Sequence, residues 1–146
     1  MEDENVIRLL NMAIVSLTVA LLILLVPLTL AYFSEAPKNI QEISESCKNR
    51  NISETSSCVV KITSEFYKYN EENMGKNLTF DELKEEGGVC SSWSDYYNEI
   101  GKGLGYNTEN LTIPVSGSIY HRLSIWSNEE GYCVIDQTKV SCFKFK

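Results

Sequence analysis

The sequence predicts a small α+β domain that follows one long apolar segment. Two patterns predict the domain: apolar side chains at helical spacing from Cys90 to Leu104, and alternating side chains from Ser118 onward. The third observation is the apolar run from Met12 to Phe33. The chain has 146 residues, which leaves room for a single compact domain after that run.

The run from Met12 to Phe33 carries no charged residue, and a helix of about 20 residues is long enough to cross a bilayer. We therefore expect a transmembrane helix over residues 12–33, after an N-terminal tail over residues 1–11. The charges of this tail are mostly acidic, whereas a cleaved signal peptide begins with basic residues. This difference favours an uncleaved anchor.

The cysteines and the glycosylation sequons favour an extracytoplasmic position for the C-terminal part. Five cysteines in so short a chain suit an oxidising compartment. Sequons at Asn51, Asn77 and Asn110 are compatible with glycosylation of an exported domain. The positive-inside rule points weakly the other way, because more basic residues follow the apolar run than precede it. We expect a single-pass protein with its domain outside rather than a cytosol-facing domain with free thiols.

Charge and composition exclude several kinds of site. The net charge of −7 and the pI near 4.8 argue against a nucleic-acid-binding protein, which would carry a basic stripe. The chain has one histidine, no glycine-rich phosphate loop and no cysteine–histidine cluster with metal-binding spacing. No acidic loop has the spacing of a calcium site. We expect neither a cofactor nor a metal ion.

Polar residues fill the segment after the apolar run, and helical patterns follow it. Residues 34–57 are predicted to be a polar stalk with a short helix at Ile40–Cys47, and residues 58–146 to be the domain. Apolar positions at helical spacing predict a helix over Cys58–Tyr69. Thr79 is placed to cap a short helix that ends before the glycine pair at 87–88.

The most regular helical pattern runs from Cys90 to Leu104 and is followed by strand patterns. In Ser118–Trp126 the alternation places the single histidine on an otherwise apolar face. A turn at 128–131 separates this strand from Tyr132–Gln137, and Lys139–Lys144 is expected to return as a hairpin.

The five cysteines leave at least one thiol unpaired within the chain. Cys47 and Cys58 flank a short polar loop that they could close. Cys133 and Cys142 would face each other across the last hairpin if its turn centres near residue 138. This pairing leaves Cys90 as the free thiol.

Cys90, His121 and Asp136 form the candidate catalytic set. Cys90 opens a helix after a glycine pair, and a helix N-terminus favours a thiolate. His121 would take the thiol proton, and Asp136 on the next strand would orient the imidazole ring. Each residue also has an ordinary structural interpretation: a packed core histidine, a small buried cysteine and an aspartate that forms a turn.

The segment around Cys90 resembles the nucleophile motif of the transglutaminase-like superfamily. In this motif Gly-x-Cys opens a helix, an aromatic residue follows at the third position and a small residue at the fourth. Residues 88–97 read Gly-Val-Cys-Ser-Ser-Trp-Ser-Asp-Tyr-Tyr, and residues 103–106 read Gly-Leu-Gly-Tyr, similar to the end of that helix in many members. The family then expects a histidine on one strand and an aspartate on the next, where His121 and Asp136 stand.

The resemblance implies an α+β, papain-like fold in which the cysteine helix packs on a small antiparallel sheet. It implies a cysteine protease, amidase or acyltransferase that cleaves a peptide or amide bond through a thioester on Cys90. Its partner would be a peptide or protein substrate. The backbone N–H of Cys90 would stabilise the oxyanion, and the side chain of Asn70 is a candidate second donor.

The sequence departs from the family pattern beside two of the three residues. His121 is followed by Arg-Leu rather than Ala-Trp, and Asp136 is not followed by proline. These departures favour a first alternative, a catalytically inactive surface-binding module that presents Tyr120, Trp126 and Tyr132 to a partner. A second alternative is a structural protein in which Cys90 forms an intermolecular disulfide.

Overall fold

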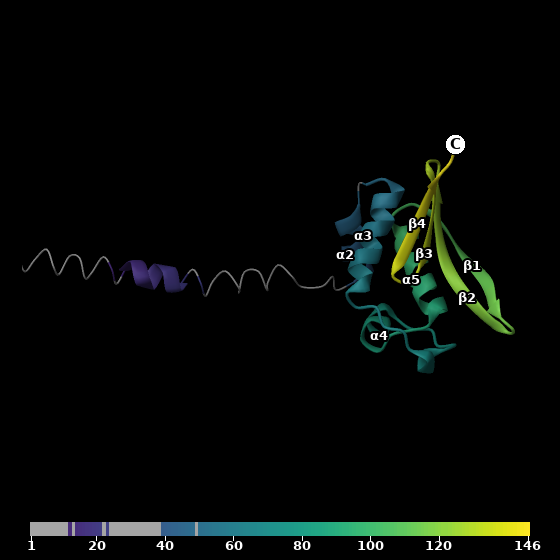
Figure 1. Cartoon of the computed structure of the whole chain (residues 1–146), viewed down its shortest axis with the longest axis horizontal. Coiled ribbons are helices and arrows are strands. Elements are labelled where there is room, and N and C mark those ends of the chain that lie inside the picture. The colour runs from purple at the N-terminus through teal and green to yellow at the C-terminus, as the bar shows by residue number, and fades with distance from the viewer. Residues whose placement is uncertain (1–11, 13, 22, 24–38, 49) are drawn as a thin grey trace, which may run out of the picture. The chain divides into compact units, whose positions relative to one another are not determined.

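The computed structural model describes residues 12, 14–21, 23, 39–48 and 50–146 of the chain (Figure 1). The chain divides into two units, Met1–Glu35 and Ala36–Lys146. In the first unit, residues 14–21 are helical. The tail expected over residues 1–11 lies outside the described residues.

The prediction of a transmembrane helix over residues 12–33 is wrong. Within the residues that the structure describes, no helix combines the length and the apolar character needed to cross a bilayer. Part of the range 12–33 lies outside the described residues. The single-pass placement is corrected together with this helix.

The two helices that begin the second unit differ from the expected stalk. Helix α2 spans Ile40–Cys47, as predicted, and α3 spans Ile52–Ser64, which begins earlier than the predicted Cys58–Tyr69. Each helix has an asparagine N-cap, Asn39 or Asn51, whose side chain accepts a backbone N–H of the first turn. Both helices bury one side in the core, so the described part of residues 34–57 belongs to the compact unit.

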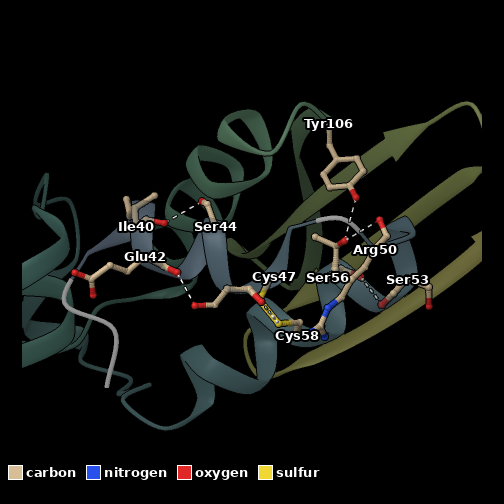
Figure 2. Close-up of a disulfide and its surroundings, with 11 residues drawn as sticks. Ile40, Glu42, Ser44, Cys47, Arg50, Ser53, Ser56, Cys58 and Tyr106 are labelled. Carbon is tan, nitrogen blue, oxygen red and sulfur yellow. Dashed lines mark hydrogen bonds between the residues drawn. A yellow bond between two sulfur atoms is a disulfide. The ribbon is translucent and has the colours of Figure 1, made fainter. Parts of the chain in front are cut away.

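A disulfide between Cys47 and Cys58 joins α2 to α3, as the sequence predicts (Figure 2). It links the last residue of α2 to the middle of α3, and Cys47 is completely buried. Ile43 on α2 is completely buried as well. The bridge therefore anchors the first helix of the unit to a helix that packs on the sheet.

The next elements lead to the helix that carries Cys90. A short 3₁₀ helix, η1, spans Glu71–Asn73, and α4 spans Phe80–Glu86. Thr79 caps α4 as predicted. Its hydroxyl accepts the backbone N–H of Glu82, and the Glu82 carboxylate accepts the backbone N–H of Thr79, so the two residues form a capping box. Helix α5 spans Cys90–Gly103, in agreement with the predicted pattern.

Four antiparallel strands in the order β1-β2-β3-β4 complete the unit (Figure 1). They span Asn107–Ser116, Ile119–Asn128, Gly131–Asp136 and Lys139–Lys144. The last three agree with the sequence patterns within two residues at each end, whereas β1 was not predicted. The second predicted disulfide, Cys133–Cys142, joins directly opposite residues of β3 and β4. Two disulfides are consistent with an extracellular domain.

The core lies between one face of the sheet and helices α3 and α5. Trp93, Tyr97 and Ile100 on α5 are almost fully buried, as are Trp126 on β2 and Ile135 on β3. This arrangement confirms the coarse prediction of an α+β domain in which the cysteine helix packs on a small antiparallel sheet.

Candidate active site

Cys90 is the first residue of α5, and of the five cysteines, all of them described, it is the one outside a disulfide. The N-cap residue Val89 gives the helix no side-chain hydrogen bond, so no side chain caps the first turn. Uncapped N–H groups and the helix dipole favour a negative charge at this point. Reactive thiolates are found at helix N-termini of this kind.

A tight glycine turn fixes the start of this helix against the segment that follows α3. Gly87 has a φ of +83°, and a side chain at Gly88 would come within 2.8 Å of Ser92 Cβ. The N–H of Gly88 donates to Lys68 O at 3.1 Å, and its carbonyl accepts the N–H of Asn70 at 3.2 Å. Residues 67–70 are therefore held beside the N-terminus of α5.

A buried polar network sets the position of α5 along β2. Asn98 on α5 accepts the hydroxyl of Ser124 at 2.5 Å and donates to Asn110 Oδ1 on β1 at 2.8 Å. One turn earlier on the helix, Asp95 pairs with Arg122 at 3.7 Å. Helix α5 and strand β2 thus run in the same direction where they pack, so the N-terminus of α5 points toward the end of β2 that carries the histidine.

His121 and Asp136 are in direct contact, as the sequence predicts. His121 Nε2 lies 2.8 Å from Asp136 Oδ1, and the side chains are 22% and 47% exposed. Strands β2 and β3 pair only as far as Ser124 and Ile135, so this contact lies just beyond the paired part of the two strands. Because Nε2 faces the carboxylate, Nδ1 is the ring nitrogen left for a thiol.

His121 is not among the buried residues of β2. The core side of this strand carries Trp126, which is completely buried, and Ser124, which bonds to α5. His121 lies beyond the paired part of β2 and β3, and its side chain is 22% exposed. The pair is therefore partly open to solvent at the end of the sheet and is not a packed core histidine.

Tyr67 connects the thiol to the histidine–aspartate pair electrostatically. Burial, followed by the neighbouring Tyr69, raises the pKa of Tyr67 to about 12. The charges of Asp136 and Cys90 both add to this rise. The electrostatic environment of Tyr67 thus includes both the Asp136 carboxyl group and the Cys90 sulfur.

Within the described residues, Cys90 makes no hydrogen bond with His121, so the candidate nucleophile and the candidate base are not hydrogen-bonded here. Hydrogen bonds of this kind are often long in sites without substrate and shorten when substrate binds. Asn70, the predicted oxyanion donor, has a structural role instead. Its side-chain amide donates to Glu86 O at 2.9 Å, and its oxygen caps η1.

A pocket of about 370 Å³ is lined by sequence neighbours of the candidate residues, although Cys90, His121 and Asp136 do not themselves line it. Its lining includes Ser91 and Ser92, which follow Cys90, and Arg122, which follows His121. Stacked rings of Phe80 and Tyr96, with centroids 5.4 Å apart, supply apolar wall. Sequence reasoning did not identify this pocket, because its walls come from segments far apart in the chain.

Two of the three sequon asparagines have their side chains engaged. Asn51 Oδ1 caps α3, and Asn110 Nδ2 donates to Asp95 Oδ1 at 2.6 Å. A glycan on Asn110 would replace that hydrogen bond, because glycosylation occurs on the side-chain nitrogen. Asn77 lies in the loop before α4, at the rim of the pocket.

No group of three or more histidine, cysteine, aspartate or glutamate side chains is placed to hold a metal ion in the part of the chain that the structure describes. Comparison with family models, curated proteins and solved structures finds no match.

Proposed function

We propose that this chain is a transglutaminase-like cysteine hydrolase or acyltransferase that acts on peptide or amide bonds through a thioester. The observation that carries the proposal is the contact between His121 Nε2 and Asp136 Oδ1 at 2.8 Å. The contact supports a catalytic base that is already oriented, with its second nitrogen free for a thiol proton. The one unpaired cysteine, at a helix N-terminus in the same region, supplies the thiol.

Acylation would proceed by general-base and nucleophilic catalysis. His121 Nδ1 takes the thiol proton while the sulfur of Cys90 forms a bond to the carbonyl carbon, and the carbonyl π electrons move to oxygen. When the oxyanion collapses, the C–N bond breaks and the amine leaves with the proton from His121. The Asp136 carboxylate stabilises the imidazolium that exists between these two proton transfers.

The acceptor in the second step decides between hydrolysis and acyl transfer. Water that loses a proton to His121 attacks the thioester, the C–S bond breaks, and the protonated thiol and a carboxylic acid are formed. A substrate amine in place of water would give a new amide. The pocket beside Ser91 and Arg122 is large enough to receive a side chain of a peptide substrate.

The test is the rate at which iodoacetamide alkylates Cys90 in the full-length, non-reduced protein at pH 6. Replacement His121→Ala or Asp136→Asn removes the base or its orienting group, and we expect the rate to fall by about tenfold or more. Asp95→Asn is the matched control, since it removes another carboxylate near the start of α5 and leaves the histidine unchanged. Equal rates in the wild type and His121→Ala would refute the proposal.

A binding module remains the second candidate because of exposed apolar side chains next to His121. Ile119 and Tyr120 are 66% and 61% exposed. Trp126, which was expected on this surface, is completely buried and cannot contact a partner. A module of this kind would keep its binding activity in Cys90→Ala, whereas the hydrolase would lose its activity.

A further inference from the structure

Tyr67 lies beside the first turn of the helix that begins at Cys90. Its ring is 4.7 Å from the ring of Trp93, centroid to centroid, and Trp93 follows Cys90 by one helical turn. The backbone just after Tyr67 is fixed as well, because Lys68 O accepts the N–H of Gly88 and the indole N–H of Trp93. Side chain and backbone contacts therefore hold Tyr67 against Trp93, one helical turn after the candidate nucleophile.

The hydroxyl of Tyr67 is buried and has no hydrogen-bond partner among the described residues. A buried polar atom without a partner carries a cost in stability, and phenylalanine would fill the same space without that cost. The folded structure thus gives the hydroxyl no role of its own. Its raised pKa, about 12, keeps the phenol protonated at physiological pH, so it is available as a donor.

We propose that the Tyr67 hydroxyl donates a hydrogen bond to the oxyanion formed when Cys90 attacks a carbonyl group, beside the backbone N–H of Cys90. The inference rests on the proposed function, since it requires acyl chemistry at this thiol. Donors that are fixed in advance stabilise a developing negative charge without reorganisation. Tyr67 takes the place that the sequence assigned to Asn70, whose amide is engaged with Glu86.

The experiment measures two reactions of Cys90 in the full-length protein with its disulfides intact. Acylation by p-nitrophenyl acetate forms an oxyanion, whereas alkylation by iodoacetamide requires the thiolate but forms no oxyanion. In Tyr67→Phe we expect the acylation rate to fall by about 100-fold, the usual effect of removing one oxyanion donor. The alkylation rate and its pH profile should remain those of the wild type.

Tyr69→Phe is the matched control. Tyr69 pairs through its backbone with Gly88, and after burial the charge of Cys90 raises the pKa of Tyr69 as well. The Tyr69 side chain is 49% exposed, however, so water can hydrate its hydroxyl. We expect a change of less than about threefold in acylation. A large loss in Tyr69→Phe with none in Tyr67→Phe would overturn the assignment of the donor.

Thermal unfolding separates the catalytic role from a structural one. Tyr67→Phe should unfold at the wild-type temperature or above it, since the hydroxyl makes no bond in the folded protein. Tyr106→Phe should unfold at a lower temperature, because the Tyr106 hydroxyl donates to Thr55 Oγ1 at 3.2 Å (Figure 2). A lower unfolding temperature for Tyr67→Phe would overturn the inference in favour of a structural hydroxyl.

The outcomes distinguish the two proposals. If Cys90→Ser is acylated as fast as the wild type, the proposed function fails and this inference fails with it. If acylation depends on Cys90 and His121 but is unchanged in Tyr67→Phe, the proposed function stands and only the oxyanion donor is refuted.

Discussion

Replacement of Asn98 by alanine should destabilise the domain by disrupting the contact between α5 and the sheet. Asn98 is 7% exposed, and its side chain accepts the hydroxyl of Ser124 at 2.5 Å and donates to Asn110 at 2.8 Å. Ser124 is completely buried. In Asn98→Ala its hydroxyl would lose the acceptor that it has in the folded protein.

The magnitude follows from these contacts. The lost bond to Asn110 is worth about 1 kcal/mol, and the unsatisfied hydroxyl of Ser124 costs about 1–3 kcal/mol. Asn110 Oδ1 keeps the hydroxyl of Ser94 as a partner, so it adds no further cost. The better helix propensity of alanine offsets about 0.5 kcal/mol. The expected net loss in the free energy of unfolding is about 1.5–3.5 kcal/mol.

Urea unfolding of the non-reduced protein, followed by tryptophan fluorescence, measures this loss. The double replacement Asn98→Ala with Ser124→Ala supplies the control, because it removes the orphaned hydroxyl as well. We expect the double variant to be about 1 kcal/mol more stable than Asn98→Ala alone. A cost under 1 kcal/mol for Asn98→Ala, or strictly additive effects in the double variant, would show that this network does not hold the helix.

Three other predictions test separate features of the fold. Replacement of both Cys133 and Cys142 by serine should lower the free energy of unfolding by about 2–3 kcal/mol, measured in urea, because the bridge closes a loop with a separation of 9 residues. Thr79→Ala should cost about 1 kcal/mol in the same assay, since the capping box of α4 is lost; a cost near zero would contradict its role. Burial raises the pKa of Tyr96 and Tyr97. Their protonated forms therefore stabilise the fold fully below pH 10, and this contribution is lost as pH rises beyond the ordinary tyrosine pKa. Circular dichroism and absorbance at about 295 nm should show unfolding and tyrosinate formation together above pH 10, and ionisation without unfolding would refute this coupling.

Local sequence patterns were sufficient to predict the elements whose structure depends only on residues close in the chain. The asparagine cap and apolar spacing of α2, the capping threonine of α4 and the hairpin of β3 and β4 are all visible in short stretches of sequence. The two disulfides belong to this class, because each joins cysteines close in the chain. The contact of His121 with Asp136 was also predictable, since consecutive antiparallel strands are neighbours in space.

Elements that bury polar residues or expose apolar ones were missed. Helix α3 buries Thr55, Ser56 and Thr63, which a hydropathy pattern assigns to solvent, so its first turns were taken as stalk. Strand β1 is exposed along almost its whole length and includes Pro114. Its apolar residues alternate only in the second half, which is too short a signal against the polar remainder.

Local sequence patterns were also insufficient to predict parts of the candidate site. The sequence pattern placed His121 on an otherwise apolar face of β2, but nothing local indicated that Ser124 would bond to Asn98, which is distant in the chain. Tyr67 could not be chosen over the other tyrosines, because its proposed role depends on a buried hydroxyl without a hydrogen-bond partner among the described residues, which no sequence pattern reveals. Both features arise from long-range packing and leave no local pattern.

The spacing of the cysteines also bears on how the chain oxidises as it folds. Loops of 11 and 9 residues close at low entropic cost, so Cys47–Cys58 and Cys133–Cys142 are the bridges that form fastest in an unfolded chain. Cys90 is more than about 30 residues from any other cysteine, so it loses this competition. Its thiol is therefore left reduced before the domain has acquired its final structure, without an enzyme or a folded barrier to protect it.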